Sequence, residues 1–307
     1  VGKWQRRNNR ETILKDAASV HPVSMTEFDQ DPYLFNCKNG TLDLRTREFR
    51  AHSPGDLLAT ISGVKYDPEA TSELWERFID DVTAIYLQKA MGYGLTWDTS
   101  EECFFTLYGA TTRNGKGTLM ETYMALVGGY GRAARPETIA QKDKTNSNAP
   151  TEDIARLAGA RVVNISEPGK QMVLSASLVK TLTGRDTINA RFLNENSFEF
   201  VPQFKLFINT NHLPKVTDPT VFDSGRVKVV PFNRHFSEEE QDKTLKRRLR
   251  QTENLSGILN WCLDGLRLLQ ETGLDAPRTV REATAQYRRD SDKIARFVDE
   301  MMEPDPH

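Results

Sequence analysis

Residues 104–118 read FFTLYGATTRNGKGT, and this stretch decides the fold of the chain. An apolar, β-prone run from Phe104 to Tyr108 leads into a turn rich in Gly, Asn and Thr. Helical spacing of apolar residues follows, at Leu119, Met120, Tyr123, Leu126 and Val127. The pattern predicts a strand, a loop and a helix, in which backbone N–H groups and the helix dipole favour an anion. We interpret the stretch as a P-loop that binds the phosphates of ATP.

The loop departs from the usual pattern G-x-x-x-x-G-K-[ST] in two places. Gly109 lies six residues before Gly115, so either the loop carries one extra residue or Ala110 takes the place of the first glycine. Gly117 occupies the usual Ser/Thr position, which leaves the hydroxyl for Mg²⁺ to Thr118. An ordinary glycine-rich turn is the alternative. The predicted nucleotide-binding residues are Gly109, Asn114, Gly115, Lys116, Gly117 and Thr118.

A carboxylate follows the next strand expected to be buried, Arg161–Ile165. Because ligands of parallel sheets gather beyond the carboxyl ends of the strands, Glu167 is the candidate catalytic acid and, with Thr118, a candidate Mg²⁺ ligand. Ser166 stands where many such enzymes carry a second acid. A solvated turn residue is the competing interpretation of Glu167.

Three further features come later in the chain. A strand that begins at Phe204 ends in polar residues at the same sheet edge, where the Asn211 amide can hold the attacking water or sense the γ-phosphate. Two β-prone runs flank the polar tip Asn194–Asn196 and predict a projecting hairpin. The strand Arg226–Phe232 then starts with an arginine.

Composition narrows the function classes. The 307 residues, 38% hydrophobic and 27% charged, suit a soluble chain of two domains or one elaborated α/β domain. A net charge of −2 gives no overall nucleic-acid signature, so any DNA contact must be local or arise in a ring-shaped assembly. Three widely spaced cysteines argue for a reducing compartment, without a disulfide framework or zinc site. With no 18-residue apolar run and no signal peptide, we expect a cytoplasmic protein that does not contact membranes.

We expect three regions in an α/β chain. Residues 1–98 form a small α/β collar or linker, with a hairpin at Asn39-Gly40 and a helix around 86–95 that ends on glycine caps. Residues 99–236 form the ATPase core around a mainly parallel sheet. Residues 237–307 are helical, beginning with a capping box at Ser237–Glu240 and continuing in a helix over Leu255–Leu269.

Ordered motifs across most of the chain carry a resemblance to a known family. They are Asn114-Gly-Lys-Gly-Thr118, Ser166-Glu-Pro-Gly169, Lys180-Thr-Leu-Thr-Gly-Arg-Asp186 with Ala190-Arg191, Asn211-His-Leu-Pro214, and Arg226 leading to Pro231-Phe232. With them, the chain resembles the helicase part of the poxvirus-type and satellite-phage-type primase-helicases, which belong to superfamily 3 of the AAA+ ATPases. The resemblance implies an AAA+ P-loop core.

The resemblance also implies roles for single residues. Lys116 would be the Walker A lysine, Glu167 the Walker B acid and Asn211 the sensor 1 amide. Arg226 would be an arginine finger that acts on the nucleotide of a neighbouring subunit.

For assembly and substrate, the resemblance implies a replicative DNA helicase of a phage, plasmid or other mobile element, which uses ATP and Mg²⁺. The hairpin would line the pore of a hexamer and grip single-stranded DNA, with Arg191, Asn194 and Asn196 as contacts. A primase domain or protein is a further expected partner, although the chain carries no recognisable primase active site.

Two other functions remain open from the sequence. Gly-Lys-Gly-Thr also occurs in nucleotide kinases, which do not need Asn211, an inter-subunit arginine or the first 100 residues. A DNA-binding initiator or scaffold would use ATP as a switch. ATP turnover stimulated by single-stranded DNA separates a motor from a scaffold.

Overall fold

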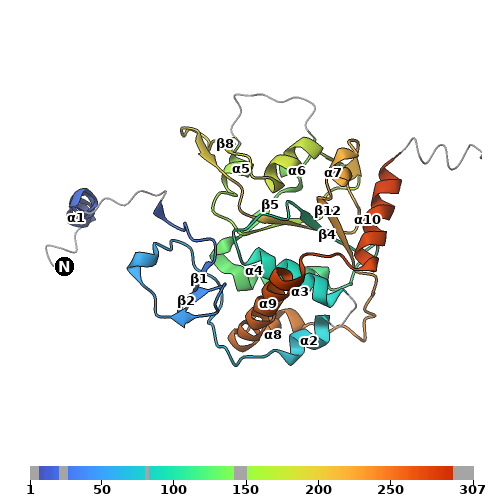
Figure 1. The fold of residues 1–307 in the computed structure, drawn as a ribbon, viewed down its shortest axis with the longest axis horizontal. Helices are drawn as coiled ribbons and strands as arrows, with labels where there is room; N and C mark the ends of the chain where they lie inside the picture. The colour runs from blue at the N-terminus through green and yellow to red at the C-terminus, as the bar shows by residue number, and fades with distance from the viewer. Residues whose placement is uncertain (1–6, 21–26, 80–82, 142–150, 293–307) are drawn as a thin grey trace, which may run out of the picture.

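The computed structural model describes residues 7–20, 27–79, 83–141 and 151–292, and its centre is a parallel sheet (Figure 1). The strand order is β12-β4-β10-β6-β5, so the carboxyl ends of all five strands lie at one edge. The predicted, mainly parallel sheet is confirmed. The strands are β4 (Phe104–Tyr108), β5 (Gly131–Ala134), β6 (Val162–Ser166), β10 (Lys205–Thr210) and β12 (Val227–Pro231).

Helices cover both faces of this sheet (Figure 1). Phe105, Leu107 and Phe207 point to one face and pack with the apolar residues of α3, α4 and α9, while Phe104 and Ile208 point to the other, against α6 and α10. Burial on both faces explains why these strands read as continuous apolar runs. The helices are α1 (Arg7–Val20), α2 (Glu73–Ile79), α3 (Ala84–Gly94), α4 (Lys116–Val127), α5 (Glu152–Ala155), α6 (Ala176–Thr183), α7 (Thr220–Asp223), α8 (Leu245–Leu249), α9 (Thr252–Thr272) and α10 (Arg278–Ser291).

Smaller sheets surround the core. The predicted hairpins at 34–43 and 188–200 are both present and antiparallel. In the first, however, the turn is Lys38-Asn39, and Gly40 already belongs to the second strand, where a Cβ would lie 2.4 Å from the Arg50 carbonyl oxygen. The remaining strands are β1 (Leu34–Cys37), β2 (Gly40–Asp43), β3 (Phe49–Arg50), β7 (Val173–Leu174), β8 (Ile188–Ala190), β9 (Phe198–Phe200) and β11 (Lys215–Val216).

The first and last parts of the chain pack together through α3 and α9. A Cβ on Gly92 would lie 2.4 Å from the Cys262 carbonyl oxygen, and one on Gly265 would lie 2.0 Å from that of Gln88. These glycines therefore permit two helix backbones to touch. Gly92 and Gly94 lie inside α3 and do not cap it, contrary to the sequence-based expectation, and Leu95 stands at its C-cap.

Two buried cations join the sheet to the preceding region. Arg161 donates to the carbonyl oxygens of Leu34 and Leu95, and its guanidinium carbon lies 4.3 Å from the ring centre of Tyr130. Lys205 donates to the carbonyl oxygens of Thr96 and Asp98. Burial lowers the pKa of Arg161 to about 10 and that of Lys205 well below its ordinary value.

The C-terminal region differs from expectation in one element. Ser237 and Glu240 form the reciprocal bonds of a capping box, but only a turn follows, and the next helix begins at Leu245. The predicted helix over 255–269 is confirmed as α9. Helix α10 covers the edge strand β12, where the Thr284 hydroxyl accepts from the Val229 N–H at 3.0 Å. None of the helices in the described ranges is both long enough and apolar enough to cross a bilayer.

Candidate nucleotide-binding site

The predicted strand, loop and helix of the P-loop are β4, residues 109–115 and α4. Gly115 is the N-cap of α4 with φ 88°, a left-handed conformation that favours glycine. A Cβ on Gly109 would lie 2.2 Å from Asn114 Nδ2 and 2.5 Å from the Phe232 carbonyl oxygen. Gly109 is thus the position that requires the absence of a side chain, and the loop is one residue longer than usual.

The Lys116 side chain is buried within the loop. Its Nζ donates to Asn211 Oδ1 at 2.6 Å, to Asn114 Oδ1 at 3.0 Å and to the Gly109 carbonyl oxygen at 3.3 Å. Burial lowers the pKa of Lys116, and the negative charge of Glu167 partly offsets this effect. The lysine therefore occupies a site where an added anion would be strongly stabilised.

The fold brings Lys116, Glu167 and Asn211 together at the carboxyl edge of the sheet. Glu167 follows β6 and Asn211 follows β10, which pair in parallel. The Glu167 N–H donates to the Asn209 carbonyl oxygen at 2.8 Å, and Glu167 has φ 51°, a conformation that costs a non-glycine residue on the order of 1–3 kcal/mol. This left-handed backbone conformation sets the direction in which the exposed Glu167 carboxylate leaves the sheet.

Two asparagines that sequence reasoning missed, Asn164 and Asn209, lie below the P-loop helix. They share the α4 face of the sheet with Ser166, because these residues lie at every second position after Val162 or Phe207. Asn164 Nδ2 donates to Ser166 Oγ at 3.2 Å, while the Oδ1 atoms of Asn164 and Asn209 are buried without a hydrogen-bond partner. The signal was an asparagine inside each of two apolar strands, which is costly without a polar ligand.

A segment that spans the predicted boundary at 236/237, residues 235–238, holds the P-loop from outside. The Phe236 N–H donates to the Arg113 carbonyl oxygen at 2.9 Å, and His235 Nδ1 lies 2.8 Å from the Thr112 carbonyl oxygen. Arg113 also forms an ion pair with Glu238 at 3.1 Å. These contacts could not be predicted from the sequence, since they join residues that lie more than 120 positions apart.

Arg226 lies away from this cluster. It precedes β12, whose first residue pairs with Phe104 at the start of β4, so it stands at the opposite sheet edge, about 16 Å from the P-loop edge along a five-residue strand. Its Nη2 donates to Glu102 Oε2 at 2.7 Å and its Nη1 to Thr183 Oγ1 at 3.0 Å. The guanidinium is mostly buried and satisfied within its own chain, apart from Nε.

The predicted DNA-binding residues lie on the β8–β9 hairpin, which projects from the body of the molecule (Figure 1). Asn194 and Asn196 are exposed at its tip, and Arg191 is half-buried beside them. The Arg191 backbone exchanges hydrogen bonds with Thr151 at 3.0 and 3.1 Å. Phe192, Phe198 and Phe200 stack along the hairpin and stiffen it.

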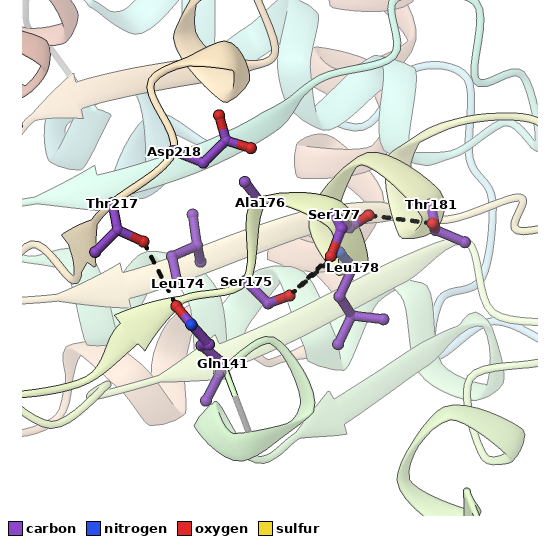
Figure 2. Close-up of a pocket in the computed structure, with 10 residues that line it drawn as sticks. Gln141, Leu174, Ser175, Ala176, Ser177, Leu178, Thr181, Thr217 and Asp218 are labelled. Atoms are coloured by element: carbon purple, nitrogen blue, oxygen red, sulfur yellow. Dashed lines mark hydrogen bonds between the residues drawn. The ribbon is translucent and has the colours of Figure 1, made fainter. Parts of the chain in front are cut away.

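Away from the P-loop, a hollow of about 600 Å³ lies where α6 begins (Figure 2). Its hydroxyl groups bond to one another or to backbone: Ser175 Oγ lies 3.3 Å from Ser177 Oγ, and Thr181 Oγ1 donates to the Ser177 carbonyl oxygen. Gln141 Oε1 accepts from Thr217 at 3.5 Å. The described residues that line the hollow include no charged cluster comparable to the P-loop, so we assign no site to it.

Two family models match parts of the chain. Residues 1–84 match the family described as D5 N terminal like, and residues 107–226 match DUF5906, a family of unknown function.

Curated relatives are named putative helicases of large viruses. One from Acanthamoeba polyphaga mimivirus is 27% identical over 96% of this chain, and one from Frog virus 3 (isolate Goorha) is 28% identical over 64%. A third, from Invertebrate iridescent virus 3, is 25% identical over 89% of the chain. The chain spans only 33%, 22% and 32% of the lengths of these relatives.

Among solved structures, two apo forms of the NrS-1 C-terminal region have the same fold. Each aligns with a TM-score of 0.56 over 75% of this chain and 54% of the other, at 13% and 15% sequence identity. At this identity the likeness concerns the fold alone.

Proposed function

Since these matches support a D5-type primase-helicase family, we propose that the chain is the motor of a DNA helicase that hydrolyses ATP. In this proposal it is an AAA+ ATPase of superfamily 3, which assembles as a ring, translocates on single-stranded DNA and serves replication together with a primase domain or protein. The observation that carries the proposal is the contact of Lys116 Nζ with Asn211 Oδ1 at 2.6 Å, beside Glu167 and inside a P-loop.

The proposed chemistry follows from the hydrogen-bond partners and protons that these groups can exchange. A bound triphosphate offers Lys116 stronger, charge-assisted acceptors than its present neutral ones, so its Nζ turns to the β/γ-phosphates. Asn211 then loses its lysine partner, and its amide is available to position water. Glu167, exposed and negatively charged, accepts the proton of that water as it attacks the γ-phosphorus. The bond from the γ-phosphorus to the oxygen that bridges it to the β-phosphate then breaks, and ADP and inorganic phosphate leave.

The oxygen atoms near the carboxyl ends of β6 and β10 suit the waters of a magnesium ion. Mg²⁺ keeps several waters in proteins, and those waters need acceptors. Ser166 Oγ and the unpartnered Oδ1 atoms of Asn164 and Asn209 supply neutral acceptors on the α4 face, and Glu167 supplies the charge. When bound, the ion would neutralise charge on the phosphates. We propose Thr118 and Glu167 as the groups nearest to it.

For Arg226 the proposal is a finger in trans, which requires release from Glu102 and Thr183 when subunits meet. The competing role is structural, as a tie between β12 and Glu102. Mixing Arg226→Ala with Lys116→Ala separates the two, because some interfaces of a co-assembled ring then pair an intact finger with an intact P-loop. Recovered ATP turnover supports the finger. No recovery despite proven co-assembly leaves the structural role.

The DNA contact is proposed for Arg191, Asn194 and Asn196. Contacts with phosphates weaken as salt rises, so Arg191→Ala should lower oligonucleotide affinity more at low salt than at high salt. The Thr151 bonds involve only the Arg191 backbone and survive the substitution. Unchanged affinity at both salt concentrations removes Arg191 from the DNA contact.

The experiment that tests the whole proposal measures ATP turnover with and without single-stranded DNA. We expect the oligonucleotide to stimulate turnover, and Lys116→Ala to abolish it, because the substitution removes the cation that neutralises phosphate charge. Nucleotide binding without turnover, or turnover that ignores DNA, would instead indicate a switch or scaffold.

A further inference from the structure

A cavity of about 530 Å³ opens beside the P-loop, within the size range of small-molecule sites. Gly115, Gly117 and Thr118 form one side of it. The other sides come from regions outside the predicted ATPase core: Phe78 from α2, and residues 240–246 from the C-terminal region. A ligand that enters the P-loop from this cavity would therefore contact three parts of the chain.

Two aromatic rings line the cavity where it meets the loop. The nearest ring carbons of Phe78 and Phe236 lie 3.2 and 3.8 Å from the position of a Cβ on Gly115. Both side chains are half-buried, and each ring has a packing partner: Phe78 packs on Trp75 at 5.6 Å, and the Arg234 guanidinium carbon lies 4.4 Å from the ring centre of Phe236. Flat rings of this kind are surfaces on which a nucleobase stacks.

The cations that line the cavity differ in whether they already form ion pairs. Arg113 is paired with Glu238, and Lys246 with Glu121. Within the described lining, Lys243 is the cation that the structure shows with no ion pair or hydrogen bond. An exposed lysine at the end of a cavity that begins at a P-loop is suited to a phosphate oxygen.

We propose that this cavity is the nucleoside subsite of the ATP site, in which Phe78 and Phe236 hold the base and Lys243 contacts a phosphate. The inference rests on the proposed ATP site and adds the part that recognises a nucleotide rather than a bare polyphosphate. It makes the N-terminal and C-terminal regions parts of the binding site.

The test compares binding of ATP with binding of inorganic tripolyphosphate, which has no base, to the full chain in the presence of Mg²⁺. We expect Phe236→Ala to weaken ATP binding about thirtyfold, the middle of the range for loss of one base–aromatic stack, and to change tripolyphosphate binding less than twofold. Phe49→Ala removes a half-buried ring elsewhere, packed on Tyr66 at 5.0 Å, and is the matched control. Equal losses for both ligands, or unchanged ATP affinity, would overturn the subsite.

The charge contact has its own variant pair. Lys243→Ala should weaken both ligands about threefold or more, whereas Arg247→Ala, which removes the same charge outside the cavity lining, should not. Equal effects of the two variants would mean a general field effect and no contact. If Lys116→Ala leaves both ligands bound as in the wild type, the proposed ATP site itself fails, and that outcome differs from any failure of the subsite.

Discussion

Gly109→Ala adds a single methyl group at the closest approach in the P-loop. The new Cβ would lie 2.2 Å from Asn114 Nδ2, 2.5 Å from the Phe232 carbonyl oxygen and 3.1 Å from Lys116 Nζ. The Phe232 N–H is itself bonded to the Tyr108 carbonyl oxygen at 2.6 Å, so that backbone cannot easily retreat. The strain should instead displace Asn114 and Lys116.

The magnitude follows from these distances. Non-bonded heavy atoms are most stable about 3.5–4.0 Å apart, so the contact with the Phe232 oxygen is short by about 1 Å. Overpacking of this kind costs about 1–3 kcal/mol. If displacement of Lys116 relieves the strain, the same free energy appears as a loss of roughly 5-fold to 150-fold in ATP affinity, at 1.4 kcal/mol per factor of ten.

The assay is equilibrium binding of a fluorescent ATP analogue, with urea unfolding of the same samples. Gly55→Ala is the control, because its Cβ would meet only Ser53 Oγ, at an ordinary 3.6 Å, far along the chain from the loop. We expect the control to bind as the wild type does. Wild-type affinity in a folded Gly109→Ala variant would refute our account of the loop and return the first-glycine role to Ala110.

Three other substitutions test the site and its support. Glu167→Gln should retain ATP but hydrolyse it about 10²–10⁴-fold more slowly, because an amide cannot accept the proton of the attacking water; equal turnover in single-cycle assays would remove Glu167 from the mechanism. Ser166→Asp should lower the Mg²⁺ concentration needed for nucleotide binding, because a carboxylate attracts the ion more strongly than a hydroxyl does; an unchanged Mg²⁺ titration would place the ion elsewhere. Burial lowers the pKa of Lys205 in the folded state. Between that lowered pKa and 10.5 the unfolded chain binds more protons than the folded chain, so the free energy of unfolding should rise with pH over this range. Lys205→Met should lose that part of the rise, and identical pH profiles for the two proteins would contradict the buried charge.

Much of the fold could be predicted because local patterns and burial agree. Continuous apolar runs followed by polar residues marked β4, β6 and β10, and helical spacing marked α4, whose five predicted apolar residues are all buried. Residues at the ends of parallel strands converge at one sheet edge, which is why the sequence alone predicts that Lys116, Glu167 and Asn211 meet.

The errors have a common physical origin. Gly40, Gly92 and Gly94 carry the usual signals of turns and caps, yet Gly40 and Gly92 are required by close contacts with another strand or helix. The Ser237–Glu240 box satisfies its own backbone and so forms without a helix after it. In each case a local pattern was correct about conformational preference, and a tertiary contact decided what the residue does.

The contacts of Arg226 also depend on tertiary structure. A strand-initial arginine after a turn has the sequence character of a finger, but its pairing with Glu102 depends on the register of β12 with β4, which the sequence does not state. Side chains also make contacts across the predicted region boundaries at 98/99 and 236/237. Arg161 bonds across the first boundary to Leu34, and Arg113 of the P-loop pairs across the second with Glu238. Because α3 and α9 also pack directly on one another, the flanking regions complete the core that they border, and the nucleotide site that we propose would draw on all three regions.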